Sequence, residues 1–201
     1  MRRYLLVAFL VPVLPLISSG CGETSSSDQG AISASLIQIG DLPAKAKEIY
    51  SPPAVPCDPL TVFADEGSEP AKSSMFAVGQ TRVQEAVGQF ASTSAAAQAY
   101  DALNAKSRLA CIQEAIALQR GSPIKIHSPH NLNVGDEAET ILFEVHPGES
   151  GQRSSVEMAS VRSERSVASL IFLDPTGKSD TALVRDVVAA AAGLLARGSE
   201  G

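Results

Sequence analysis

Three stretches in the second half of the chain alternate between apolar and polar side chains, which predicts strands of an antiparallel sheet. They are, in chain order, Glu139 to His146, Val156 to Arg162 and Val167 to Leu173. In the first stretch Ile141 and Phe143 share one face, and Glu144 lies on the opposite face. Such alternation is typical of a sheet covered on one face. The short connections at 147–151 and 163–165 suit hairpins.

The end of the chain predicts a long amphipathic helix from Asp180 to Arg197. Asp180 is suited to cap its N-terminus, and Arg197 complements the negative C-terminal end. Apolar residues recur along one side, at Leu183, Val184, Val187, Val188, Ala191, Leu194 and Leu195. The covered face of the sheet is the only predicted surface large enough to bury this stripe, so we expect the helix to pack there.

A second helix is predicted in the first half of the chain, where Ser92, Thr93 or Ser94 is suited to cap it. Its apolar or small residues recur at steps of three and four, at Ala96, Ala99, Tyr100, Leu103, Ser107, Ala110 and Cys111. The next segment, Ile112 to Arg120, fits either a strand or a continuation of the helix. A Gly-Ser-Pro sequence at 121–123 ends it.

The region before this helix is less regular. Asp41 is suited to cap a short helix, while residues 51–72 hold too many prolines for a helix or a central strand. Val83 to Val87 predicts a strand, and because Glu85 places a charge on its apolar face we expect an edge strand. Together these elements predict an α+β fold, an antiparallel sheet with helices packed on one face.

Composition and charge restrict the class of protein. The chain has 201 residues, of which 44% are hydrophobic and 19% charged, enough for one folded domain with a core and too apolar for a disordered chain. Its 16 basic residues are outnumbered by 22 acidic ones, giving a net charge of −6. This balance argues against nucleic acid as a partner.

The N-terminus has the anatomy of a secretory signal peptide, which we place at residues 1–20. Arg2 and Arg3 precede an uncharged apolar run from Tyr4 to Ile17, and a small-residue zone follows. This run reaches only about 21 Å as a helix, short of the roughly 30 Å hydrocarbon core of a membrane. A permanent transmembrane helix is therefore the weaker interpretation.

The sequence Ile-Ser-Ser-Gly-Cys at 17–21 resembles a bacterial lipobox, in which the chain is cut before a diacylated cysteine. The resemblance implies that Cys21 is the lipidation site and that the cell membrane is a partner through this anchor. Ser18 and Gly20 also satisfy the small-x-small rule of ordinary signal peptidase, so simple secretion with an unlipidated Cys21 stays open. Residues 21–35 then form the lipidated cysteine and a flexible polar stalk, and 36–201 form the folded domain.

Two cysteines remain, Cys57 and Cys111. Export would place them in an oxidising compartment, where a disulfide is the default expectation. It would close a loop of about 55 residues and contribute roughly 4 kcal/mol. A redox-active pair and a free reactive thiol are the alternatives, but the chain lacks a C-x-x-C arrangement.

Taken in order, the segments resemble the extracellular sensor domain of PknH-type receptor serine/threonine kinases and the actinobacterial lipoproteins that share it. The segments that carry the resemblance are Leu36-Ile37-x3-Asp41-Leu42-Pro43, Cys57, Val83 to Phe90, Ser94 to Ala99, Cys111 and Gly135-Asp136-Glu137-Ala138. The resemblance implies an α+β sensor-like domain with a cleft, a disulfide between Cys57 and Cys111, and the sensing of an extracytoplasmic ligand. The kinase sensors carry a second disulfide and a kinase domain, and this chain has neither.

We find no pattern typical of a catalytic site, so we expect no catalytic residues, no metal and no cofactor. The chain has no Gly-x-Ser-x-Gly elbow, no glycine-rich phosphate loop and no zinc-type spacing. His127, His130 and His146 are expected to be solvated rather than metal ligands. The carboxylates Asp136, Glu137 and Glu139 are likewise expected to be solvated, without the alternation of a calcium loop.

The sequence therefore predicts a non-enzymatic lipoprotein that binds or senses a ligand on the extracytoplasmic face of the cell membrane. Its ligand-binding residues and its ligand or protein partner are unknown from the sequence. A carrier of an apolar envelope molecule is the first alternative, and it needs a cavity between the sheet and the C-terminal helix. A hydrolase without a recognisable catalytic motif is the second alternative.

Overall fold

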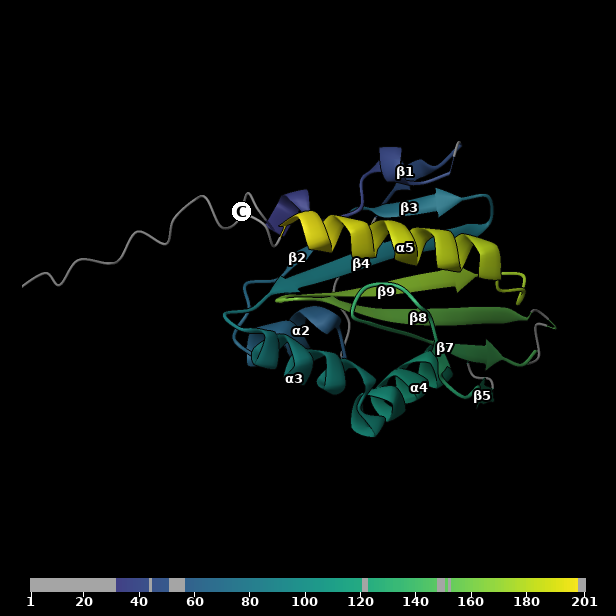
Figure 1. Ribbon diagram of the computed structural model, residues 1–201. Coiled ribbons are helices and arrows are strands. Elements are labelled where there is room, and N and C mark those ends of the chain that lie inside the picture. The colour runs from purple at the N-terminus through teal and green to yellow at the C-terminus, as the bar shows by residue number, and fades with distance from the viewer. Residues whose placement is uncertain are drawn as a thin grey trace, which may run out of the picture.

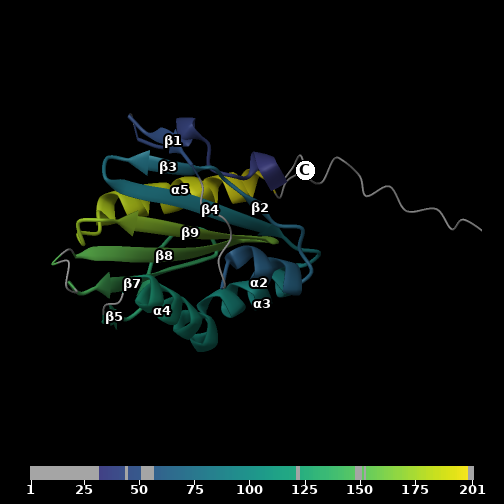
Figure 2. The same cartoon turned by 180° about the vertical axis from the view of Figure 1, so that it is seen from behind.

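The structure is a computed structural model that describes residues 32–43, 45–50, 57–120, 123–147, 151 and 153–198. It is a single antiparallel sheet with helices on both faces (Figure 1; Figure 2 shows the reverse side). The strands are β1 (Lys47–Ile49), β2 (Ala71–Lys72), β3 (Met75–Val78), β4 (Thr81–Gln89), β5 (Ile124–Ile126), β6 (His130–Asn131), β7 (Glu137–Val145), β8 (Ser154–Ser163) and β9 (Ser166–Asp174). The helices are η1 (Ile39–Asp41), α2 (Pro59–Asp65), α3 (Thr93–Asn104), α4 (Lys106–Arg120) and α5 (Thr181–Gly198).

The sheet has the strand order β1-β3-β4-β9-β8-β7-β5, with β2 paired to β4 and β6 paired to β7. The three predicted strands of the second half are β7, β8 and β9, which pair antiparallel in sequence order. Glu164 and Arg165 form the two-residue turn between β8 and β9, and Glu164 has a φ of 51°, as tight hairpin turns require. The predicted antiparallel sheet is confirmed.

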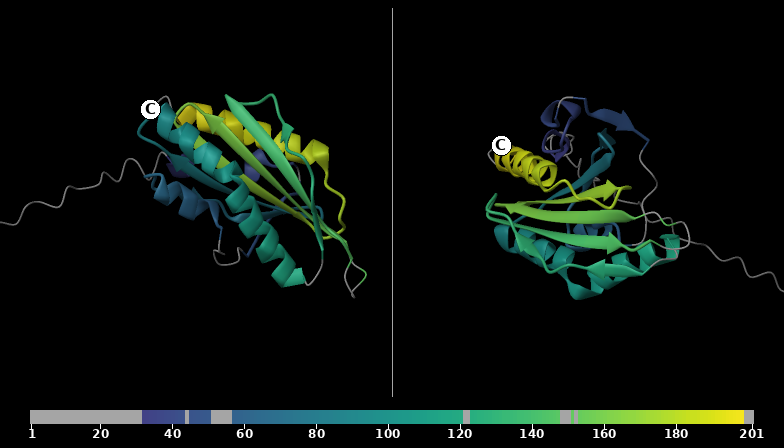
Figure 3. Two further views of the ribbon diagram at one scale, coloured as in Figure 1. Left: turned by 90° about the horizontal axis from the view of Figure 1, so that it is seen from below. Right: turned by 90° about the vertical axis from the view of Figure 1, so that its right-hand side faces the viewer.

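Strand β9 shows how the sheet separates two cores. Leu170 and Phe172 are buried on the face covered by α5. Val167 packs against α3, and Ile171 lies on the same side, among residues packed by α4. In Figure 3 the yellow α5 and the teal α3 and α4 lie on opposite sides of the sheet. The expectation that helices cover only one face is wrong, because β9 is apolar on both faces and each face must be shielded from water.

The predicted strand at Val83 to Val87 is confirmed as part of β4, but it is not an edge strand. It lies between β3 and β9, and the side chain of Glu85 is only 1% exposed. The prediction failed because it assumed that a glutamate on this face must be charged and exposed to solvent. Burial raises the pKa of Glu85 to about 8, so its side chain is accommodated inside the sheet as a neutral group. The buried carboxyl group of Glu85 is therefore largely neutral at neutral pH.

The C-terminal helix agrees with its prediction. Oδ1 of Asp180 accepts a hydrogen bond from the backbone N–H of Leu183 at 3.1 Å, which caps α5. Its buried stripe consists of Leu183, Val184, Val187, Val188, Ala191, Ala192 and Leu195. Each large side chain in this stripe stabilises the domain by roughly 1.5–3 kcal/mol through burial.

Helices α3 and α4 follow one another with a single break. Oγ of Ser92 accepts a hydrogen bond from the N–H of Ala95 at 3.1 Å and caps α3. The extended backbone of Ala105 (φ −62°, ψ 140°) ends α3, and α4 begins at the next residue. The segment Ile112 to Arg120, which fitted a strand or a helix, belongs to α4.

Helix α2 lies in the region that the proline content predicted to be irregular. Pro59 occupies the first helical position, where its missing N–H has no partner to lose, and Asp58 caps the helix by accepting from Leu60 N at 3.0 Å. Phe63 is fully buried and meets Phe90 edge to face, with ring centroids 6.0 Å apart. The prediction was wrong because it counted prolines without placing them relative to the helix start.

The first described residues pack on the α5 side of the sheet. Ile32, Leu36 and Ile37 are buried in the same core as α5. Asp41 does not begin a helix as expected; it ends η1, and its Oδ2 accepts from the N–H of Gln38 at 2.9 Å. The predicted signal peptide and the first part of the predicted stalk, including Cys21, lie outside the described residues.

Candidate functional site

The two cysteines of the folded domain form the expected disulfide. Cys57 and Cys111 are joined with their Cα atoms 6.1 Å apart. The bridge ties α4 to the segment that enters α2, two elements 54 residues apart in sequence. It therefore braces the face of the sheet that carries α2, α3 and α4, and leaves no thiol at either position for redox chemistry.

Two of the three histidines, His127 and His146, lie near the carboxylate of Glu144. Nε2 of His127 lies 3.1 Å from Oε2 of Glu144, and this contact lowers the pKa of the glutamate. His130 belongs to β6 and His146 follows β7. Within the described ranges, no three His, Cys, Asp or Glu side chains are placed to hold a metal ion.

The predicted carboxylate cluster divides between two environments. Asp136 and Glu137 form ion pairs with Arg162, at 3.3 Å to Nη1 and 2.9 Å to Nε. Both carboxylates are about half exposed, so these pairs stabilise the turn before β7 only weakly. Glu139 points to the α3 side, and burial raises its pKa.

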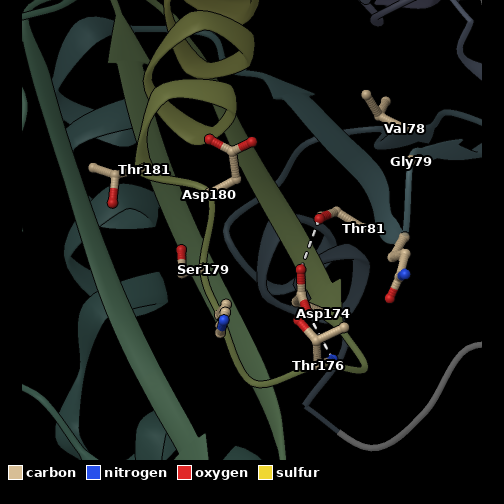
Figure 4. A pocket seen from close by; sticks show the side chains of 10 residues that line it. Val78, Gly79, Thr81, Asp174, Thr176, Ser179, Asp180 and Thr181 are labelled. Carbon is tan, nitrogen blue, oxygen red and sulfur yellow. Dashed lines mark hydrogen bonds between the residues drawn. The ribbon is translucent and has the colours of Figure 1, made fainter.

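An open hollow of about 590 Å³ lies where the β3–β4 turn meets the connection from β9 to α5 (Figure 4). It is lined mainly by polar groups, namely Gln80, Thr81, Asp174, Thr176, Lys178, Ser179, Asp180 and Thr181. A recess with so many hydroxyl and carboxylate groups is a first candidate for ligand binding.

The polar groups of this hollow are, however, largely satisfied by one another. Oδ1 of Asp174 accepts from the N–H and hydroxyl of Thr176 at 2.7 and 2.5 Å, and Oδ2 accepts from Thr81 Oγ1 at 3.0 Å. Ser179 donates to Glu157, and Asp180 caps α5. Burial acts to raise the pKa of Asp174, but these hydrogen bonds outweigh it and the pKa is lowered. The hollow is thus well explained as structural support for a turn.

A second polar group of side chains lies between the sheet and the junction of α3 with α4, and we call it the polar seam. It consists of Asn104, Arg108, Ser160 and Ser169. Oγ of Ser160 donates to Oδ1 of Asn104 at 3.0 Å, and Ser160 lies directly opposite Ser169 in the β8–β9 register. Since residues opposite each other share a face, Ser169 also points toward the helices.

Arg108 is the charged member of the polar seam and is only 7% exposed. Its Nη1 donates to the carbonyl oxygen of Leu103 at 2.7 Å, beside Asn104. Its Nε and Nη2 are buried and have no partner among the described residues. Burial lowers the pKa of Arg108 to about 10, and the nearby Asp58 acts to raise it. The guanidinium is therefore still charged at neutral pH.

The carboxylate that acts on Arg108, Asp58, already pairs with another cation. Asp58 accepts from Lys72 Nζ at 3.1 Å and from the N–H of Leu60. In the described part of the chain no ion pair joins Asp58 to Arg108. Asp58 is therefore paired with Lys72, and it stabilises the charge of Arg108 from nearby without forming an ion pair with it.

The unpartnered atoms of the polar seam are mostly hydrogen-bond donors. They are Nε and Nη2 of Arg108, Nδ2 of Asn104 and Oγ of Ser169. Leaving one such buried group without a partner costs about 1–3 kcal/mol, and more for a charged group. Native proteins rarely tolerate several together unless a ligand or ordered water completes them. This makes the polar seam the better candidate site.

Sequence reasoning missed the polar seam. The predicted stripe of the first-half helix passed over Asn104 and Arg108, because a polar residue on an amphipathic helix ordinarily faces solvent. A sign was present in the four-residue spacing of Asn104 and Arg108, which would place both on one side of a continuous helix. Their inward direction follows only from the break at Ala105 and from strand pairing.

The cavity that a carrier would need between the sheet and α5 is occupied by protein. The α5 stripe packs there against Val83, Val87, Leu170 and Phe172, all of which are buried. None of the helices within the described ranges is both long and apolar enough to span a membrane.

No known family matches the chain, and no curated protein does. Among solved structures, the fold is similar to the crystal structure of the extracellular domain of PknH from Mycobacterium tuberculosis. The TM-score is 0.48 and the sequence identity 10%, over 86% of this chain and 96% of that one.

Proposed function

We propose that this protein is a non-catalytic module that binds an anionic ligand outside the cytoplasmic membrane, where lipid on Cys21 holds it. The observation that carries the proposal is Arg108, a buried and charged side chain with two unpartnered N–H groups. A guanidinium that presents two free donors side by side matches the geometry of a carboxylate or phosphate.

The chemistry of the polar seam favours binding over catalysis. Arginine does not exchange protons near neutral pH, and amide and hydroxyl donors position a ligand without transferring protons. An anion seated beside Arg108 would accept hydrogen bonds from its unpartnered Nε and Nη2. The expected result of occupancy is a more stable domain, since the ligand would remove the cost of unpartnered donors.

Thermal unfolding of the full-length Cys21→Ala protein tests the binding part of the proposal. Inorganic phosphate and acetate are the probes, and sodium chloride at equal ionic strength is the reference. We expect a rise in the melting temperature that depends on phosphate or acetate concentration and disappears in Arg108→Met. Arg185→Met is the matched control, because Arg185 is 67% exposed on α5. Equal shifts in all three proteins would refute the site.

Fractionation of cells tests the anchor. The protein with its native Cys21 should sediment with membranes and need detergent for release. Cys21→Ala should move it to the soluble exported fraction, because two acyl chains supply lasting attachment and no other anchor is proposed. Continued sedimentation of the variant would contradict lipid anchoring, while leaving the binding proposal to its own test.

A further inference from the structure

The polar seam continues into an apolar region that is incompletely covered. On the α4 side, Ile141, Phe143 and Met158 are buried. The residues packed on them are only partly buried, namely Leu109, Ile112, Ile116, Ile124, Val156 and Ile171. By contrast, seven residues of α5 are buried on the other face. Helix α4 thus leaves part of its apolar side accessible, beside the unpartnered donors of Arg108.

The order of residues along β9 places the two features next to each other. Val167 belongs to the core under α3, Ser169 belongs to the polar seam, and Ile171 packs with the core under α4. Along α4, Arg108 is followed by Leu109 and, three residues later, Ile112. A ligand whose charged end reached Arg108 would therefore extend along half-buried aliphatic side chains.

We propose that the polar seam binds the anionic head group, a carboxylate or a phosphate, of a single-chain amphiphile whose apolar tail lies along the half-buried side of α4. This rests on the proposed function, which requires only that an anion binds at Arg108. An apolar tail is proposed because Arg108 lies on the same helix, α4, as the half-buried side chains of Ile112 and Ile116. It would shield Ile112 and Ile116 from water, which their present partial burial does not do.

One neighbouring carboxylate acts against the ligand. Glu139 lies opposite Ser160 in the β7–β8 register and so shares the face of the polar seam. Asp58 is matched by Lys72, which leaves Glu139 as the carboxylate that borders the seam from β7. Glu139→Gln should tighten the binding of an anionic ligand several-fold, and it should not affect an uncharged ligand of the same length.

Calorimetric titration of the full-length Cys21→Ala protein tests the inference. The probes are octanoate, decanoate, decyl phosphate and decanol, each below its aggregation concentration, together with acetate and inorganic phosphate. We expect decanoate or decyl phosphate to bind, and the preference between them identifies the head group. Affinity should rise about fourfold for each methylene added to the chain. Decanol should bind at least tenfold more weakly, because it cannot pair with Arg108.

Two variants separate the head from the tail. Arg108→Met should weaken decanoate binding at least tenfold without lowering the melting temperature of the free protein, because the gain from removing a buried charge that forms no ion pair offsets the lost hydrogen bond to Leu103. Ile116→Gln should weaken decanoate but not acetate. Arg185→Met and Leu118→Gln are the controls, since Leu118 is 79% exposed on α4.

The outcomes distinguish the two proposals. One outcome is that acetate or phosphate binds only when Arg108 is present, while affinity does not rise from acetate to octanoate to decanoate. This result would overturn the amphiphile proposal and leave the proposed function standing. Decanol bound as tightly as decanoate would overturn the head-group assignment. No binding by any probe would overturn both proposals, because the unpartnered donors of the seam would then be completed by ordered water alone.

Discussion

The backbone N–H of Ile37 donates a hydrogen bond to Oε2 of Glu85 at 2.6 Å, joining residues 48 positions apart in sequence. Both residues are 1% exposed. Oε1 of the same carboxyl group has no partner within the described ranges. The contact attaches the first described segment to the central strand β4, and its strength depends on the charge of one buried carboxyl group.

Glu85 should make the stability of the domain depend on pH. Burial raises the pKa of Glu85 from 4.5 to about 8, while the N–H of Ile37 lowers it and the charge of Asp41 raises it further. Between those pH values the folded state holds a proton that the unfolded state has lost. The stability contributed by neutral Glu85 is therefore complete below about pH 4.5 and is lost as the pH rises toward 8.

Glu85→Gln tests this assignment because glutamine cannot ionise. We expect its free energy of unfolding to exceed that of the native sequence at pH 8, and the difference to shrink toward pH 4.5. Urea denaturation across this range measures it. Glu114→Gln, on the exposed side of α4, should leave the pH profile unchanged. A profile that Glu85→Gln does not flatten would contradict a neutral buried carboxyl group.

The disulfide should be worth a large share of the domain's stability. Replacing both Cys57 and Cys111 with serine removes a bridge that spans 54 residues, and the chain-entropy estimate for this loss is about 4 kcal/mol. Because the bridge holds α4, hydrogen exchange should accelerate there more than in α5. Urea denaturation of the oxidised protein and the double variant measures the difference. A change below about 1 kcal/mol would show that the bridge hardly restricts the unfolded chain.

Gly135 should not tolerate a side chain. Its φ is +61°, and a Cβ atom there would approach the carbonyl oxygen of Arg162 to 2.6 Å. Gly79→Ala is the matched control, since Gly79 has a φ of +63° and open space around it. We expect Gly79→Ala to cost roughly 1–2 kcal/mol from the backbone alone, and Gly135→Ala roughly 1–3 kcal/mol more from the collision. Equal losses of stability in the two variants would mean that the backbone around Gly135 and Arg162 shifts to accommodate the added Cβ atom without further cost.

Asp174→Asn should destabilise the turn before α5 without altering ligand binding. Hydrogen bonds from Thr176 and Thr81 hold the carboxylate charged. The lowered pKa means that this stability is present above the usual pKa of aspartate and is lost as the pH falls through the folded value. We expect a loss of about 2 kcal/mol at pH 7 that diminishes in acid. Asp186→Asn, which is 66% exposed, is the control.

Part of the polar seam could be predicted from the sequence. Asn104 lies within the predicted helix, although outside its apolar stripe, and the alternation that predicts β8 and β9 shows which residues of each strand share a face with Ser160 or with Ser169. What no pattern in the sequence supplies is the pairing of Ser160 with Ser169, because strand register depends on which strands become neighbours. The direction of Arg108 likewise depends on the backbone break at Ala105.

The amino-acid sequence alone determined the strands β7 to β9, the C-terminal helix with its Asp180 cap, and the pairing of the cysteines. The strands and the helix depend on local periodicity and capping, which neighbouring residues encode directly, and the cysteine pairing depends on only two cysteines remaining in the folded domain. Only the tertiary structure decided that β4 is central, that helices cover both faces, and that Arg108 and Glu85 are buried. Whether a charge is buried depends on which distant elements pack around it, and that packing is a property of the whole chain rather than of any segment.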